Sequence, residues 1–127
     1  MSRDVDLVRE ALAAFQRGEL DRAFEFAHPD IVSFRAPPLP DPQTYRGIEG
    51  VLQMYADWTA DFEEFEMEAL EFVEADDRVI VEILQRATGK ASGAMVDGRF
   101  WFVFTLIDGK IARQEIYGSR EQALESA

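Results

Sequence analysis

The sequence predicts an α+β fold in which helices pack on one side of a curved antiparallel sheet. Apolar residues recur at helical spacing in the first half of the chain, and in much of the second half they alternate with a period of two. Helices grouped before a run of strands favour this class because they can then cover one face of the sheet. The 127 residues suit one domain, 1–127, and 47% of them are hydrophobic, so a core needs no disulfide.

Two helices are expected at the beginning of the chain. The first covers 4–17, where the apolar stripe is formed by Val5, Val8, Leu12 and Phe15. Gly18 follows it, and glycine is preferred where a helix ends in a left-handed turn. The second helix covers 19–27. Pro29 is expected to stop it, because proline supplies no amide hydrogen and restricts the residue before it.

A strand, a loop and a third helix are expected next. The strand, 31–35, is rich in residues that favour β-structure. The segment 36–45 holds four of the five prolines and is expected to be a loop. The third helix is expected to begin near Gly47 and to continue to Phe62, because the apolar residues in between keep helical spacing.

The second half of the chain predicts two hairpins and a short closing helix. Four long strands are expected, at 67–75, 78–88, 99–107 and 110–117. The first two flank a tight turn at 76–77, and the last two flank Asp-Gly at 108–109, a strong hairpin signal. Ser119 and Gln122 have the spacing of a capping box, which predicts a last helix to residue 126.

Composition argues against two classes of partner. The net charge of −12 would repel both the phosphates of nucleic acids and anionic membrane surfaces. No window of the sequence holds enough consecutive apolar residues to span a bilayer. The chain has no cysteine, which fits a reducing compartment, and we expect a cytoplasmic protein.

Neither a metal nor a cofactor is expected. Ten carboxylates and no Lys or Arg lie within 57–77, but their spacing matches no calcium loop, and this run predicts a solvated face. His28 is the only histidine, and we expect it to cap a helix or lie on the surface rather than act as a base. The sequence has no glycine-rich phosphate loop.

Four segments of the sequence carry a family resemblance: FQRGELDRAFEFAHPDIV, YRGIEGV, LIDGKI and YGSREQALE. They resemble the SnoaL-like branch of the nuclear-transport-factor-2-like superfamily. This resemblance implies a curved sheet wrapped around a long helix, which gives a cone with an apolar cavity. It also implies a homodimer that packs sheet to sheet. The superfamily includes isomerases, polyketide cyclases, epoxide hydrolases and dehydratases, and the fold does not choose among them.

The resemblance argues against a ketosteroid isomerase. It places Ala11, Arg35 and Phe102 where that enzyme has a tyrosine, an aspartate base and a protonated aspartic acid. Arg35 cannot replace the base, because a guanidinium stays protonated at any ordinary pH. We therefore expect another ligand or another reaction.

The same resemblance, applied position by position, predicts a polar cluster in the cavity. It points Arg113, Glu115 and Tyr117 inward, on one face of a regular strand, together with Arg35. The opposite face would then carry Ala112, Gln114 and Ile116. Ligand-contacting side chains are expected at Phe15, Arg35, Tyr55, Trp58, Phe102, Arg113 and Tyr117.

Glu115 is the candidate catalytic residue. It would act as general acid or base, while an arginine orients the substrate or stabilises an oxyanion and Tyr117 donates a hydrogen bond. The alternative is an ion pair of Glu115 with Arg35 or Arg113 at the mouth of the cone. An arginine within hydrogen-bonding distance would favour the ion pair.

Three functions stay open. The first is binding of a small, largely apolar molecule, and the second is cofactor-independent catalysis through Glu115 by an isomerase, cyclase, dehydratase or hydrolase. A cavity of at least a few hundred Å³ that reaches Glu115 would favour these two. The third is a non-catalytic dimerisation module, favoured if aromatic side chains such as Trp58 fill the cavity. Ile80 and Leu84, expected on the outer face, support a homodimer through the sheet.

Overall fold

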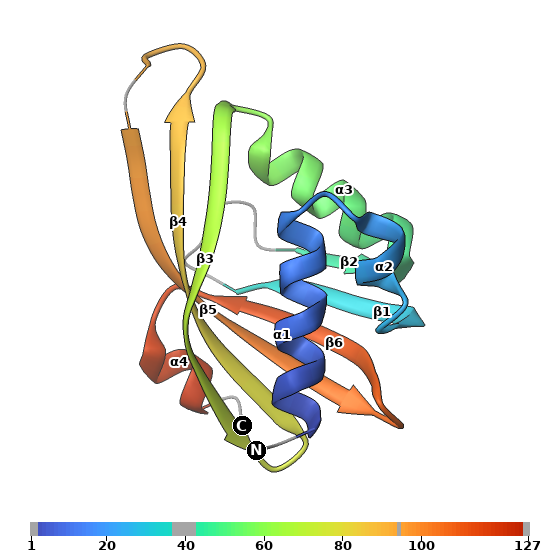
Figure 1. Ribbon diagram of the computed structural model, residues 1–127. Coiled ribbons are helices and arrows are strands. Elements are labelled where there is room, and N and C mark those ends of the chain that lie inside the picture. The colour runs from blue at the N-terminus through green and yellow to red at the C-terminus, as the bar shows by residue number, and fades with distance from the viewer. Residues whose placement is uncertain (1–2, 37–42, 94, 126–127) are drawn as a thin grey trace.

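The sheet has six strands, and helices cover both of its faces (Figure 1). The structure is a computed structural model that describes residues 3–36, 43–93 and 95–125. The helices are α1 (Arg3–Gln16), α2 (Leu20–Phe24), α3 (Gly47–Thr59) and α4 (Arg120–Glu125). The strands are β1 (Ala27–Arg35), β2 (Thr44–Arg46), β3 (Phe62–Ala75), β4 (Arg78–Gly89), β5 (Met95–Ile107) and β6 (Lys110–Tyr117).

The strand order confirms the expected α+β class. The order across the sheet is β2-β1-β6-β5-β4-β3. All neighbours are antiparallel except β1 and β6, which pair in parallel. In Figure 1, α1 and α3 lie over one face of the curved sheet, and α4 lies against the other. We call these the inner and the outer face.

Both expected hairpins are present with two-residue turns. Ala75 pairs with Arg78, and Ile107 pairs with Lys110. In the second turn Asp108 and Gly109 have φ angles of 52° and 74°. Two consecutive left-handed residues are what a type I′ turn requires, and the Asp-Gly sequence favours this turn.

Several strands are longer, and the second and third helices shorter, than the sequence predicts. The second helix ends at Phe24, and β1 begins at Ala27, before Pro29. Pro29 is tolerated in the strand because the register of β1 against β6 is irregular between Ala27 and Val32, where no regular ladder bond is lost. The third helix ends at Thr59 rather than at Phe62, which instead begins β3.

The start of β5 and the end of the proline-rich loop differ from the sequence prediction. The cap expected at Ser119 is present. β5 already begins at Met95, inside the expected connection, and β2 lies at the end of the expected loop. The backbone N–H of Gln122 donates to Ser119 Oγ at 3.2 Å, as the capping box predicts. Residue 126, the expected end of the last helix, lies outside the described residues.

Two hydrophobic clusters lie on opposite faces of the sheet. The inner cluster joins α1 and α3 to inward residues of the strands, for example Val79, Val81 and Ile83. The smaller outer cluster lies under α4 and includes Ile80 and Val103. None of the helices in the described ranges is long and apolar enough to cross a membrane.

Candidate functional site

A β-bulge reverses the faces that the sequence predicts for β6. Ile111 pairs with Leu106 of β5, but Arg113 pairs with Thr105, so Ala112 is one extra residue between two adjacent positions of the partner strand. Side chains alternate with a period of two, so one extra residue exchanges the faces of everything that follows. The expectation that Arg113, Glu115 and Tyr117 line the cavity is therefore wrong, because these side chains lie on the outer face.

Arg113, Glu115 and Tyr117 contact one another on the outer face of the sheet. Tyr117 donates its hydroxyl proton to Glu115 Oε2 at 2.5 Å, and Arg113 Nε lies 3.4 Å from Glu115 Oε1. The Glu115 side chain is only 9% exposed, while that of Arg113 is 50% exposed. The ring of Tyr117 belongs to the outer cluster with Ile80 and Val103. An arginine therefore does hold Glu115, as the ion-pair alternative expects, but on the side of the sheet away from the cavity.

The inner face of β6 carries Gln114 and Ile116, which the sequence-based overlay had assigned to the outside. Ile116 belongs to the inner core, and Gln114 is buried. Gln114 Nε2 donates to the Tyr55 hydroxyl oxygen at 3.3 Å and to Ser33 Oγ at 3.4 Å. Gln114 and Ile116 are therefore inner-face residues that the sequence did not predict.

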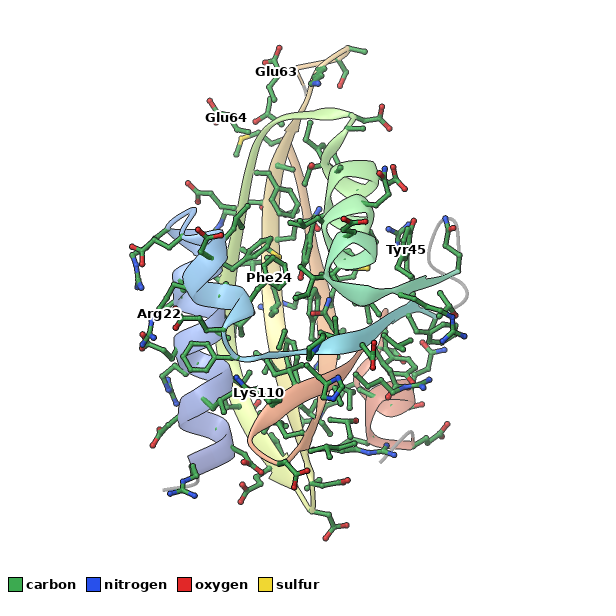
Figure 2. All side chains as sticks on the ribbon, turned by 90° about the vertical axis from the view of Figure 1, so that its right-hand side faces the viewer. Arg22, Phe24, Tyr45, Glu63, Glu64 and Lys110 are labelled. Carbon is green, nitrogen blue, oxygen red and sulfur yellow. The ribbon has the colours of Figure 1, made fainter. Side chains whose placement is uncertain are left out.

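A small apolar cavity lies between α1, α2, α3 and the inner face of the sheet. Its volume is about 50 Å³, room for a few water molecules. Its apolar lining is Val8, Ala11, Leu12, Phe15, Ala23, Phe24, Ala27, Ile31, Val51, Phe104 and Ile111. Tyr55 and Gln114 are the two polar residues of the lining. In Figure 2, Phe24 lies in the space between α2 and α3, whereas Tyr45 lies on the other side of α3.

Burial changes the chemistry of Tyr55. Desolvation of the phenol raises the pKa of Tyr55 to about 12, against a smaller lowering by the hydrogen bond from Gln114. The hydroxyl therefore keeps its proton at any ordinary pH and can act as a hydrogen-bond donor. Among the residues that the structure describes, none that lines the cavity is a carboxylate, histidine, lysine or arginine.

A larger open groove lies beside this cavity, between the end of α1 and β3. Its volume is about 330 Å³, and its lining is Phe15, Gln16, Phe65, Glu66 and Met67. The side-chain amide of Gln16 donates to the backbone carbonyl of Met67, which ties α1 to β3. Phe15 lines both spaces, and its ring lies 4.5 Å from that of Tyr55. Phe15 therefore separates the cavity from the groove.

The part of the cone near the end of α3 is filled by side chains. Trp58 Nε1 donates to Gln85 Oε1 at 2.5 Å, and the Arg35 guanidinium lies 4.5 Å from the centre of the Trp58 ring. Phe102 fills the floor below, and only about 10 Å³ remains open among these residues. Arg35, Trp58 and Phe102 thus lie on the inner side, but Trp58 and Phe102 are in the packed part of the cone, and this packing is the outcome expected to favour the non-catalytic dimerisation module.

His28 and the acidic run of β3 lie outside the lining of the cavity. His28 Nδ1 accepts a hydrogen bond from the backbone N–H of Asp30 at 3.0 Å, so His28 braces the start of β1. The acidic run of β3 is exposed, and Glu63 and Glu64 project from the end of the molecule (Figure 2). Within the described ranges, no group of three or more His, Cys, Asp or Glu side chains is placed to hold a metal ion.

The chain belongs to the SnoaL-like family, because residues 8–114 match the model of the SnoaL-like domain. An uncharacterized protein of Mycobacterium tuberculosis is 28% identical over 123 residues, which cover 97% of this chain and 94% of that protein. A solved NTF2-like protein of unknown function from Burkholderia pseudomallei superposes with a TM-score of 0.80 at 22% identity, over 98% of this chain and 97% of that one.

A second solved relative was crystallised with a small molecule. TerC, co-crystallised with polyporic acid, superposes with a TM-score of 0.80 at 20% identity, over 98% of this chain and 97% of that one. At these identities the two solved structures establish the fold and not the activity.

Proposed function

We propose that this SnoaL-like protein binds a small, largely apolar molecule in the cavity between α1, α3 and β6. The observation that carries the proposal is the lining itself, which is apolar except for the contact of Gln114 with Tyr55. Concave apolar sites with a few convergent polar groups are typical of ligand pockets. The crystallisation of TerC with polyporic acid supports the use of this fold for small molecules.

The cavity alone is smaller than such a ligand. Ligand pockets usually measure roughly 300–1,000 Å³, whereas this cavity measures about 50 Å³. Phe15 is the one residue that lines both the cavity and the adjoining groove, and it is partly exposed. Rotation of the Phe15 ring toward solvent would join the two spaces. The proposed site therefore opens by a side-chain movement of Phe15.

Binding is favoured over acid–base catalysis. General acid–base chemistry needs a group that exchanges a proton near the operating pH, within hydrogen-bond reach of the substrate. Glu115 is bound by Tyr117 and Arg113 on the outer face, and Tyr55 holds its proton to about pH 12. The lining supplies hydrogen-bond donors and acceptors but no proton-transfer group matched to neutral pH.

We also propose that the protein is a cytoplasmic homodimer that pairs through its outer sheet face. The apolar side chains of Leu84 and Trp101 are partly exposed on this face. Sedimentation velocity should give a species of twice the 14.5 kDa chain mass. A species of chain mass alone at high protein concentration would contradict the dimer.

The binding site is tested with a neutral apolar probe, 4-ethyltoluene. Saturation-transfer-difference NMR should detect binding to the natural protein. Ala11→Leu, which places a larger side chain in the lining, should reduce this binding at least tenfold. Ala13→Leu is the matched control, because it lies on the same helix but outside the lining. Unchanged binding to Ala11→Leu would refute the site.

A further inference from the structure

Gln114 and Tyr55 form the polar pair of the cavity lining, and the orientation of the Gln114 side-chain amide follows from its hydrogen bonds. Ser33 Oγ donates its single proton to Met54 Sδ at 2.9 Å, and a thioether sulfur can only accept. Ser33 must therefore accept from Gln114, so the NH₂ side of the Gln114 amide faces Ser33. The same nitrogen donates to the Tyr55 oxygen at 3.3 Å. This chain of donors fixes the orientation of the amide.

Two hydrogen-bonding functions of the pair are left unused. The amide N–H groups of Gln114 donate to Ser33 Oγ and to the hydroxyl oxygen of Tyr55. No hydrogen bond among the residues of 3–36, 43–93 and 95–125 uses Gln114 Oε1 or the hydroxyl proton of Tyr55. One acceptor and one donor are thus available from residues that both line the cavity.

We propose that the ligand of the cavity is an uncharged compound with a hydroxyl group, an alcohol or a phenol, which Tyr55 and Gln114 recognise together. A hydroxyl accepts one hydrogen bond and donates another, so a single group satisfies both Tyr55 O–H and Gln114 Oε1. This inference rests on the proposed binding function and adds the chemical class of the ligand.

Charged ligands fit the lining poorly. A carboxylate would lose its hydration in a cavity whose lining offers no cation, and it has no proton for Gln114 Oε1. An ammonium group would find no carboxylate there. A pure hydrocarbon would enter but would leave both polar groups without a partner, which costs binding free energy. The high pKa of Tyr55 supports the inference, because the phenol remains a donor across the working pH range.

The position of the pair also orients the ligand. Tyr55 contacts Phe15 on one side and Gln114 on the other. The hydroxyl end of the ligand is therefore held at the Gln114 end, and its apolar remainder extends past Phe15 toward the groove. The groove is bordered by the exposed carboxylate residue Glu66, which further disfavours an anionic tail.

Three probes of one shape test the inference: 4-ethylphenol, 4-ethyltoluene and 4-ethylbenzoate. We expect the natural protein to bind the phenol about tenfold more tightly than the toluene, the gain of two modest hydrogen bonds, and the benzoate most weakly. Tyr55→Phe and Gln114→Met should each bring the ratio of phenol affinity to toluene affinity closer to one. Tyr45→Phe is the matched control, because its hydroxyl binds Asp57 and it does not line the cavity.

The outcomes separate the inference from the proposed function. Equal affinities for phenol and toluene, or tightest binding of the benzoate, overturn the hydroxyl recognition and leave the binding site intact. Failure of all three probes to bind overturns both. If a variant does not fold, as judged by circular dichroism, the ranking of the three probes on the natural protein decides the matter by itself.

Discussion

The side-chain amide nitrogen of Gln114 lies 3.3 Å from the hydroxyl oxygen of Tyr55, inside the cone. Gln114 reaches this position only because the bulge at Ala112 turns it inward. The same bulge turns Glu115 outward, to Tyr117 and Arg113. One extra residue in β6 therefore decides which polar group enters the cavity and which leaves it.

Glu115→Gln should lower stability and leave ligand binding unchanged. The substitution removes a charge-assisted hydrogen bond from Tyr117 and the ion pair with Arg113, and the loss should be about 1–3 kcal/mol in the free energy of unfolding. Urea denaturation measures it. Glu68→Gln is the control, since its pair with Arg86 is exposed and should contribute less than about 1 kcal/mol. Weakened binding of 4-ethyltoluene to Glu115→Gln would contradict the placement of Glu115 outside the binding site.

Deletion of Ala112 should leave the faces of β6 and the native fold in place. Ile111 would still pair with Leu106 and Arg113 with Thr105, so the side chains that follow keep their faces. We expect a cooperative unfolding transition by circular dichroism, as for deletion of Ala91, which is exposed in the turn between β4 and β5. Insertion of one alanine after Ala112 should instead abolish the transition, because a one-residue bulge would then direct Arg113 and Glu115 into the apolar core, at a cost of several kcal/mol for each charge left without water. A native-like transition of the insertion variant would disprove that one extra residue sets the faces of β6.

The bulge also explains why the sequence predicts the fold better than the site. Hairpin turns and helix stripes are local signals, and 108–109 or the stripe of α1 can be recognised from a few residues. The face on which Gln114 lies depends on the pairing of Ile111 with Leu106 of the neighbouring strand, and this pairing cannot be recognised from the residues of β6 alone. A local sign did exist: Ile111 and Ile116 are an odd number of positions apart, so both can be buried on one face only across a bulge.

Phe15→Ala should destabilise the protein but strengthen binding of apolar probes. Phe15 is partly exposed, so the loss should be about 1–3 kcal/mol, less than for a fully buried phenylalanine. Removal of the ring joins the cavity to the groove, so 4-ethyltoluene should bind more tightly. Leu7→Ala, on the same helix but outside both linings, is the control. Weaker binding to Phe15→Ala would show that Phe15 contacts the ligand rather than separates the two spaces.

Tyr55 should make stability fall between pH 10 and 12. Its pKa is about 12 in the folded protein and 10.0 for the free side chain, so the unfolded chain loses this proton first as the pH rises. The contribution is complete below pH 10 and should decline by about 2 kcal/mol by pH 12. The difference between the natural protein and Tyr55→Phe in urea denaturation isolates this effect. Parallel pH profiles of the two proteins would contradict it.

The location of a bound probe tests the cone site most directly. Intermolecular NOEs from 4-ethyltoluene can be measured on the methyl-labelled protein. We predict contacts with the cavity methyl groups of Val8, Leu12 and Val51 and with the ring of Tyr55. Contacts with Ile80 and Val103 of the outer cluster instead would contradict the site.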